Sequence, residues 1–98
     1  MGIPQIKTRP EWSKNCTQKY ALWKAIKKAG SQLKLATLIN CHQSNFYYWK
    51  NRPNVTAHTN LMDPEYALAI QDAVKIKGLA IQLAPSLKKW KEKLKKCN

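Results

Sequence analysis

A short run of hydrogen-bonding side chains carries most of the chemistry that this sequence could perform. From residue 42 to residue 48 the order is His, Gln, Ser, Asn, Phe, Tyr and Tyr. An amide such as that of Gln43 can form two parallel hydrogen bonds to adenine, and a hydroxyl such as that of Ser44 can pair with several bases. Phe46 and Trp49 lie three positions apart, which is the spacing of the inward side of a helix. The polar side chains between them are therefore expected to point outward.

The other reactive side chains do not form a catalytic or metal-binding pattern. Cys16, Cys41 and Cys97 are far apart, and the neighbours Cys41 and His42 lack the second pair of ligands that a zinc site needs. The carboxylates show no paired arrangement, and the three glycines do not form a phosphate-binding loop. We therefore expect no enzymatic activity, metal, cofactor or small-molecule substrate. Cysteines without a disulfide pattern also favour a reducing, cytoplasmic setting.

The charge of the chain is large, positive and unevenly distributed. The 98 residues include 18 Lys and Arg against 5 Asp and Glu, a formal net charge of +13, whereas small domains usually carry about 2–8. Residues 54–74 contain no Lys or Arg, and residues 75–98 contain eight lysines. With 44% hydrophobic residues the chain can bury a core, and no apolar run approaches the roughly 20 residues of a membrane span. The composition predicts a small folded domain that binds a polyanion and not a membrane.

Hydrophobic spacing predicts three short helices in the first half of the chain. A helix over about 18–29 has apolar residues at i, i+3, i+4 and i+7 and ends at Gly30. A second helix is expected over about 32–39. Asn40 tolerates a left-handed backbone, so it permits a tight turn before a third helix over about 42–50. Two helices joined by so short a turn cross steeply, as in a helix-turn-helix.

The second half of the chain predicts a helix, a short strand and a last, lysine-rich helix. Asp63, Pro64 and Glu65 form a typical helix start, and Gly78 is expected to end that element. Residues 79–84 alternate large apolar side chains with smaller or polar ones, which predicts a short edge strand. A lysine-rich helix is expected over about 87–96.

The expected fold class is all-α, with four to five helices and a short C-terminal edge strand. Three parts are predicted along the chain. Residues 1–16 form a flexible basic N-terminal arm that Trp12 anchors, residues 17–84 form the helix-turn-helix domain, and residues 85–98 form a lysine-rich C-terminal helix or tail.

The predicted turn and the helices around it resemble the helix-turn-helix of phage Cro repressors, in which a Gln-Ser pair likewise opens the recognition helix. The residues that carry this resemblance are QLKLATLINCHQSNFYYWK, from Gln32 to Lys50. Over about residues 21–84 the chain is similar to the Cro/YdaS-like repressor family, with PEYALAIQDAV matching its fourth helix. The sequence departs from that family in Asn40 for the usual turn glycine, in His42 for the usual capping serine, and in a bulky aromatic run over 46–49.

The resemblance implies that the helix over 42–50 enters the major groove of double-stranded DNA and reads base edges. The residues expected to contact bases are Gln43, Ser44, Asn45, Tyr47 and Tyr48. The residues expected to contact phosphates are Gln32, Lys34, His42, Lys50 and Arg52. A protein of this kind would regulate transcription, as a repressor that blocks polymerase by occupying an operator.

A homodimer is expected because one short recognition helix reads too few base pairs for high specificity. Two-fold pairing would place two such helices about 34–36 Å apart, one turn of DNA, and the predicted edge strand over 79–84 is the expected interface. Two other functions fit the sequence. One is a nonspecific nucleic-acid-binding protein that uses charge alone, and the other is a basic protein-interaction module, such as a toxin partner or an inhibitor of an acidic protein.

Overall fold

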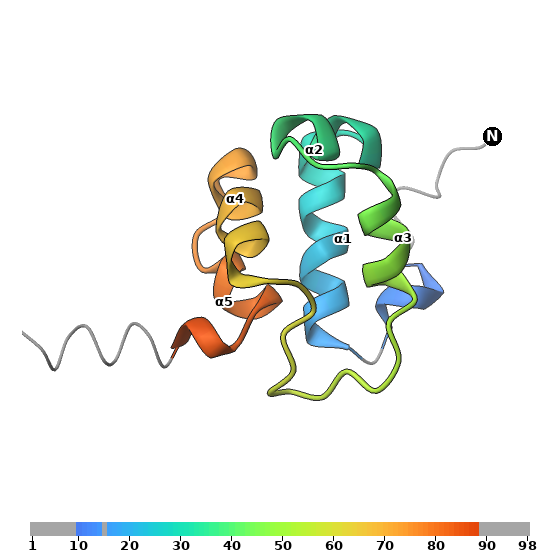
Figure 1. Ribbon diagram of the computed structural model, residues 1–98, viewed down its shortest axis with the longest axis vertical. Helices are drawn as coiled ribbons and strands as arrows, with labels where there is room; N and C mark the ends of the chain where they lie inside the picture. Colours follow the sequence, from blue (N-terminus) through green and yellow to red (C-terminus); the bar gives the residue numbers. More distant parts are fainter. Residues whose placement is uncertain (1–9, 15, 89–98) are drawn as a thin grey trace, which may run out of the picture.

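The computed structural model describes residues 10–14 and 16–88, and this part of the chain is built from helices and loops without a strand (Figure 1). The all-α prediction is therefore confirmed. No helix in these two ranges is long and apolar enough to cross a membrane. The helical elements are the 3-10 turn η2 (Glu11–Ser13), α1 (Thr17–Ala29), α2 (Gln32–Leu38), α3 (Ser44–Lys50), α4 (Pro64–Val74) and α5 (Leu79–Leu83).

Helix α1 is the central element of the fold. In Figure 1 it stands between α4 and α5 on one side and α3 on the other, with α2 across one end. Leu22 and Ala25 are fully buried three positions apart on its inward side. Gln18 lies one turn earlier on the same side, and its Nε2 donates hydrogen bonds to the carbonyls of Thr56 and Thr59 at 2.6 and 2.7 Å. This buried amide therefore ties the long loop after α3 to α1.

The tight connection between α2 and α3 depends on Asn40. Its φ is 56°, in the left-handed region that Asn tolerates better than most residues. The reversal lets the Cys41 N–H donate to the Ala36 carbonyl at 3.0 Å, which closes the turn across the end of α2. Helix α3 begins at Ser44, two residues later than the predicted start at His42. The predicted order of helix, tight turn and helix is present.

Aromatic packing fixes α3 against the rest of the molecule. Phe46 is fully buried and Trp49 is 5% exposed, and their ring centroids lie 5.0 Å apart. The Trp49 ring also meets the edge of Tyr66 in α4, with centroids 5.4 Å apart. Leu35 and Ala36 of α2 are buried in the same cluster. A seven-residue helix is unstable in isolation, so this packing holds α3 in position.

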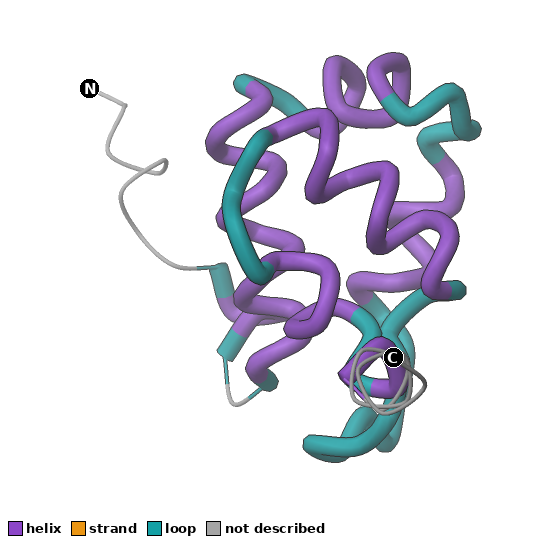
Figure 2. The backbone as a smooth tube through the Cα atoms, turned by 90° about the vertical axis from the view of Figure 1, so that its left-hand side faces the viewer, coloured by secondary structure: helices purple, strands orange, loops and turns teal. Residues whose placement is uncertain are grey.

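The segment after Gly78 is the helix α5, so the edge strand predicted over 79–84 is wrong (Figure 2). Leu79 and Leu83 are buried four positions apart. Residues with this spacing share a side in both a strand and a helix, so an alternation this short does not distinguish them. The Ala80 N–H donates to Oε1 of Gln71 at 2.9 Å rather than to a neighbouring strand. A dimer interface made by pairing strand edges is thus contradicted here.

The predicted arm and tail are described only in part. Residues 1–9 lie outside the described residues, while η2 and Trp12 pack beside α1, with Trp12 against the core as expected. Of the helix predicted over 87–96, Leu87 is half-buried against the core, and residues 89–98 lie outside the described residues.

Candidate nucleic-acid interface

The first turn of α3 presents an amide and a hydroxyl to the surface. Gln43 precedes the helix with an αR backbone, and both Gln43 and Ser44 are exposed. The tyrosines that follow are also turned outward: Tyr47 is 70% exposed and Tyr48 is 68% exposed. The outward side of α3 therefore combines hydrogen-bonding groups with two large aromatic rings, while Phe46 on its inward side is buried.

His42 caps the start of α3. Its Nδ1 accepts a hydrogen bond from the backbone N–H of Ser44 at 3.2 Å and lies 2.9 Å from Oγ of Ser44. This contact satisfies a backbone group that would otherwise lack a partner within the helix. His42 thus supports the start of α3 from the residue before the N-cap Gln43, and its ring lies within hydrogen-bonding distance of the Ser44 hydroxyl.

A chain of polar contacts joins α2 to both ends of α3. Nε2 of Gln32 donates to Oε1 of Gln43 at 3.3 Å, and Nζ of Lys50 donates to Oε1 of Gln32 at 2.7 Å. The same Lys50 ammonium lies 5.6 Å from the centroid of the Trp12 ring in η2. Gln32 therefore holds the Gln43 side chain, and Lys50 holds Gln32. The Nε2 donors of Gln43 and one lone pair on its Oε1 stay available to a ligand.

Asn45 is less accessible than its neighbours in the predicted base-contacting set. It is half-buried, and its side chain hydrogen-bonds the thiol of Cys41 in the turn. Burial raises the pKa of that thiol above its ordinary value, and the bond from Asn45 offsets part of the rise. Asn45 therefore supports the turn from within the helix.

The two remaining predicted phosphate contacts differ in their surroundings. The Arg52 guanidinium donates to the carbonyl of Leu61 at 3.1 Å, and the Arg52 carbonyl accepts from Nζ of Lys19 at 2.8 Å, so this residue fastens the loop after α3. Lys34 is exposed, and its side chain lies over Gly30 at the junction of α1 and α2. The structure therefore brings together Gln32, His42, Gln43, Ser44 and Lys50, and it leaves Lys34 and Arg52 outside that group.

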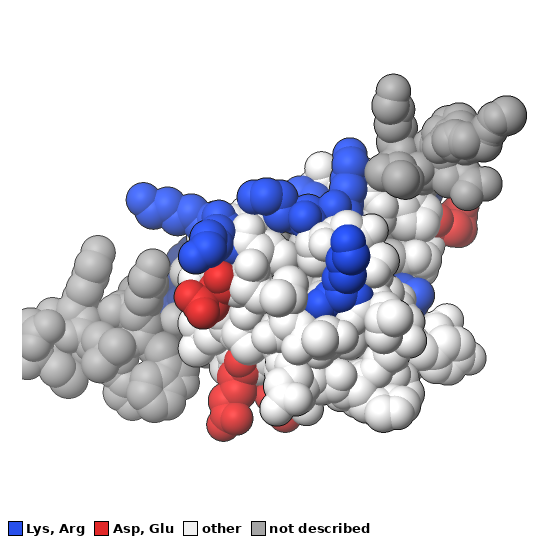
Figure 3. Space-filling model, turned by 90° about the horizontal axis from the view of Figure 1, so that it is seen from above, with Lys and Arg blue, Asp and Glu red and all other residues white. Residues whose placement is uncertain are grey.

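Basic side chains dominate one half of the surface seen from the α2 end. In that view Lys and Arg side chains extend across the upper half of the picture, and Asp and Glu side chains lie partly at the lower edge and partly beside basic ones (Figure 3). The acids of α4 and its N-cap are Asp63, Glu65 and Asp72. These three are the acids of the segment between residues 54 and 74, which contains no Lys or Arg.

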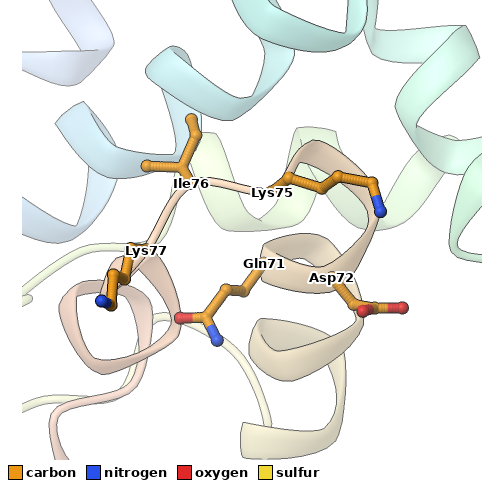
Figure 4. Close-up of a pocket in the computed structure, with 5 residues that line it drawn as sticks. All are labelled: Gln71, Asp72, Lys75, Ile76 and Lys77. Carbon is orange, nitrogen blue, oxygen red and sulfur yellow. The ribbon is translucent and has the colours of Figure 1, made fainter.

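Two hollows lie beside α4, away from α3. The smaller one, of about 250 Å³, is formed where Lys75 reverses the chain with a φ of 56°, and Figure 4 shows Lys75 and Asp72 on one side of it and Lys77 on the other. The larger one, of about 840 Å³, includes Leu68 and Ile81 in its lining. Within the described residues no group of three or more His, Cys, Asp or Glu side chains is placed to hold a metal ion.

Sequence reasoning missed Trp12 as a neighbour of the candidate site and missed the polar contacts of Gln32 and Lys50. The eleven-residue spacing of the two glutamines is visible in the sequence, but their hydrogen bond follows from the steep crossing of α2 and α3. No protein-family model, no curated protein and no solved structure matches this chain.

Proposed function

We propose that this protein is a sequence-specific double-stranded DNA-binding regulator of transcription, of the Cro-like repressor type. Helix α3 enters the major groove, and occupancy of an operator blocks polymerase. The observation that carries the proposal is the exposed amide of Gln43, which the Gln32 amide holds at 3.3 Å on the first turn of α3. A regulator of this kind works in the cytoplasm.

Fixed geometry supports direct reading of bases by this helix. Phe46 and Trp49 anchor α3 from behind, so the backbone of its first turn cannot shift without disturbing the core. A side chain that is already held in place loses less conformational entropy when it binds. An amide held in this way is suited to the paired hydrogen bonds that distinguish adenine from the other bases.

The two exposed tyrosines extend the reading surface along α3. Each ring offers apolar area to a thymine methyl group, and each hydroxyl offers a hydrogen bond to a phosphate. Because the rings are bulky, they also exclude water from the groove around Gln43. We therefore assign base contacts mainly to Gln43, Ser44, Tyr47 and Tyr48, with Asn45 supporting the turn through its contact with Cys41.

Phosphate contacts come from cations around the same surface. Lys50 sits at the C-terminal end of α3 and Lys34 at the junction of α1 and α2. Lys50 lies on the reading helix and Lys34 on the preceding helix, so they suit contacts that set the register of the protein on the duplex without reading its sequence. His42 adds a hydrogen-bonding group at the N-terminal end of α3, and Gln32 contributes by holding the Gln43 amide.

We also propose that the protein forms a dimer. Because residues 79–84 form a helix and not a strand, the proposed interface is a different surface. The larger hollow beside α4 contains Leu68, which is 48% exposed, together with the half-buried Ile81 and Leu87. An exposed apolar groove of this kind is the surface that a second copy of the chain would cover. The groove lies away from α3, so a partner seated there leaves the reading helix free.

A competition assay tests the proposal against its first rival, nonspecific binding by charge alone. A labelled duplex enriched by selection from random DNA is bound by the protein and then challenged with an excess of random duplex. A specific regulator resists this competitor, because specific sites bind typically about 10³–10⁷-fold more tightly than random sequence. Equal displacement by random duplex and by the selected duplex itself would favour the nonspecific binder.

A further inference from the structure

The outward side of α1 forms a basic face that the proposed function does not use. Its side chains recur at i, i+3, i+4, i+7 and i+8, which places them on one side of the helix. This side is opposite the buried face that contains Leu22 and Ala25. We call it the α1 outer face, and its residues are Tyr20, Trp23, Lys24, Lys27 and Lys28.

Each lysine of the α1 outer face is held in place by a neighbour. Nζ of Lys24 lies 4.9 Å from the centroid of the Tyr20 ring, and Nζ of Lys27 lies 5.1 Å from the Trp23 ring. The two rings are themselves stacked, with centroids 5.7 Å apart and planes inclined by 27°. Because these ammonium groups are positioned beforehand, they lose less side-chain entropy on binding an anion than free lysines do.

Contacts with the α4 and α5 region hold the same face from its other edge. Nζ of Lys28 donates to the carbonyl of Val74 at 3.3 Å, at the end of α4. Nζ of Lys24 also donates to Oε1 of Gln82 at 3.5 Å. These acceptors are neutral, so they orient the ammonium groups and leave their charge uncompensated.

No carboxylate of the described residues neutralises this face. Helix α1 contains no Asp or Glu. Within residues 10–14 and 16–88, the one ion pair joins Lys14 to Glu11 at 3.6 Å, outside this face. Three like charges on consecutive turns repel one another, so the arrangement lowers its energy when a polyanion binds.

We propose that the α1 outer face is a second nucleic-acid site, which binds the sugar–phosphate backbone of a DNA segment other than the one read by α3. Phosphates are the ligands that a row of uncompensated lysines fits. A membrane surface is disfavoured because the apolar side of α1 is buried in the core. An acidic protein partner is the alternative that competition with polyglutamate distinguishes from DNA.

The two sites are built from different residues. The polar contacts around Gln43 run through α2, α3 and η2, and none of them involves the α1 outer face. In this proposal a duplex held by α3 leaves that face open, so that one protein molecule bridges two DNA segments. The proposal that the α1 outer face binds a phosphate backbone is argued from the α1 contacts alone. That it is a second site, in addition to α3, rests on the proposed function.

A capture experiment with the full chain tests this proposal. Protein is bound to a bead-linked duplex, unbound protein is washed away, and retention of a second, fluorescent duplex is measured. The variant Lys24→Gln, Lys27→Gln, Lys28→Gln is compared with the same three positions changed to Arg. A matched control changes three lysines elsewhere, Lys75→Gln, Lys77→Gln and Lys88→Gln, and thermal melting checks that every variant is folded.

The wild type and the arginine variant are expected to retain the second duplex, and the α1 glutamine variant is expected to release it while keeping the first. For binding of random duplex, the α1 glutamine variant should also flatten the salt slope by about 2.7, since each phosphate that a lysine no longer neutralises accounts for about 0.9. An equal effect in the matched control would overturn the proposal, because charge alone would then explain capture. Displacement of DNA by polyglutamate as readily as by DNA itself would indicate an acidic protein partner and overturn it as well.

A separate variant tests base reading by α3 independently of the α1 site. Gln43→Ala with Ser44→Ala removes the reading groups of α3 and leaves α1 unchanged. If this variant loses sequence preference but still binds random duplex with the wild-type salt slope, base reading by α3 holds, and the capture result decides the α1 site. If it keeps its preference, base reading by α3 is wrong, and the capture result still decides the α1 site.

Discussion

Gln43 is the residue on which the functional proposal depends most. Its amide is exposed, it accepts a hydrogen bond from Gln32, and it precedes a helix that cannot move because Phe46 is buried behind it. Gln32 is in turn held by Lys50 at 2.7 Å. At this scale Gln32 and Lys50 are positioning residues, and Gln43 with Ser44 would touch the bases.

Replacing Gln43 by Ala should relax sequence preference at one base position. The paired amide contact is worth about 1–3 kcal/mol of discrimination against the wrong base, so affinity for the preferred base should fall while other positions are unaffected. Lys34→Ala is the matched contrast, because Lys34 contacts neither glutamine, and it should weaken all sequences alike. Binding of every single-base variant of a selected site measures both changes; identical patterns for the two variants would speak against direct reading.

Gln32→Ala should impair the same base position as Gln43→Ala, and less strongly, because Gln32 acts only by holding the Gln43 amide. The double variant should then bind only slightly more weakly than Gln43→Ala alone. A double-mutant cycle on the same set of duplexes measures this coupling. Additive effects at two different base positions would show that Gln32 contacts DNA independently.

The thiol of Cys41 should react slowly near neutral pH. Burial raises its pKa, so the thiolate that attacks an alkylating reagent forms at higher pH than in an exposed cysteine. A folded-state pKa above the unfolded value also means that stability is complete below the unfolded pKa and decreases as pH rises through the folded pKa. Labelling of a Cys16→Ser, Cys97→Ser variant across pH, folded and in denaturant, measures the difference. Coincident pH profiles would contradict it.

At the scale of secondary-structure elements, the fold contains several short helices that would be unstable in isolation. Helices α2 and α3 have seven residues each, and α5 has five. Their stability comes from burying Leu35, Phe46 and Leu83 against the longer α1 and α4. The turn at Asn40 determines how α2 and α3 cross, and so it determines where Gln43 points.

Asn40→Ala should destabilise the protein by about 1 kcal/mol, because its φ of 56° is costly for a residue with a Cβ and no local hydrogen-bonding group. Asn40→Gly should be neutral or stabilising, since glycine adopts positive φ without strain. Chemical denaturation of the two variants gives the comparison. The account of the turn would be wrong if the alanine variant were as stable as the glycine variant.

Helices with strong end signals could be predicted from the sequence, and segments with ambiguous periodicity could not. Gly30, Asn40 and Asp63–Pro64 mark boundaries that the structure confirms to within about two residues. The strand prediction at 79–84 failed because Leu79 and Leu83 share a side in either conformation, and packing against α1 and α4 decided the outcome. The set of exposed residues on α3 followed from the spacing of Phe46 and Trp49. The inward contacts of Asn45 and Arg52 depend on tertiary structure and carry no sequence signal.

At the scale of the whole molecule, three surfaces have different characters. The outward side of α3 is polar and aromatic, the α1 outer face is basic, and the groove beside α4 is apolar with acids at one end. A molecule with these surfaces could read one duplex, bind the backbone of another and pair with a second copy at the same time. The net charge of +13 would make all DNA binding strongly dependent on salt.

Leu68→Glu should shift the protein towards the monomer, since it places a charge in the apolar groove that a second copy would cover. Leu38→Glu is the matched control, because Leu38 is also an exposed leucine, at 59%, and lies on α2 away from the groove. Analytical ultracentrifugation over a range of concentrations gives the distribution. A wild type that stays monomeric with and without DNA would remove the dimer from the proposal.

Selection of bound sequences from a random pool of duplexes tests the central claim most directly. An exposed pair of reading groups on a rigid α3, present twice in a dimer, predicts a consensus of two inverted half-sites about one DNA turn apart, with an adenine at the position whose preference Gln43→Ala abolishes. Recovery of sequences without any shared pattern, at an affinity equal to that of the starting pool, would contradict the claim.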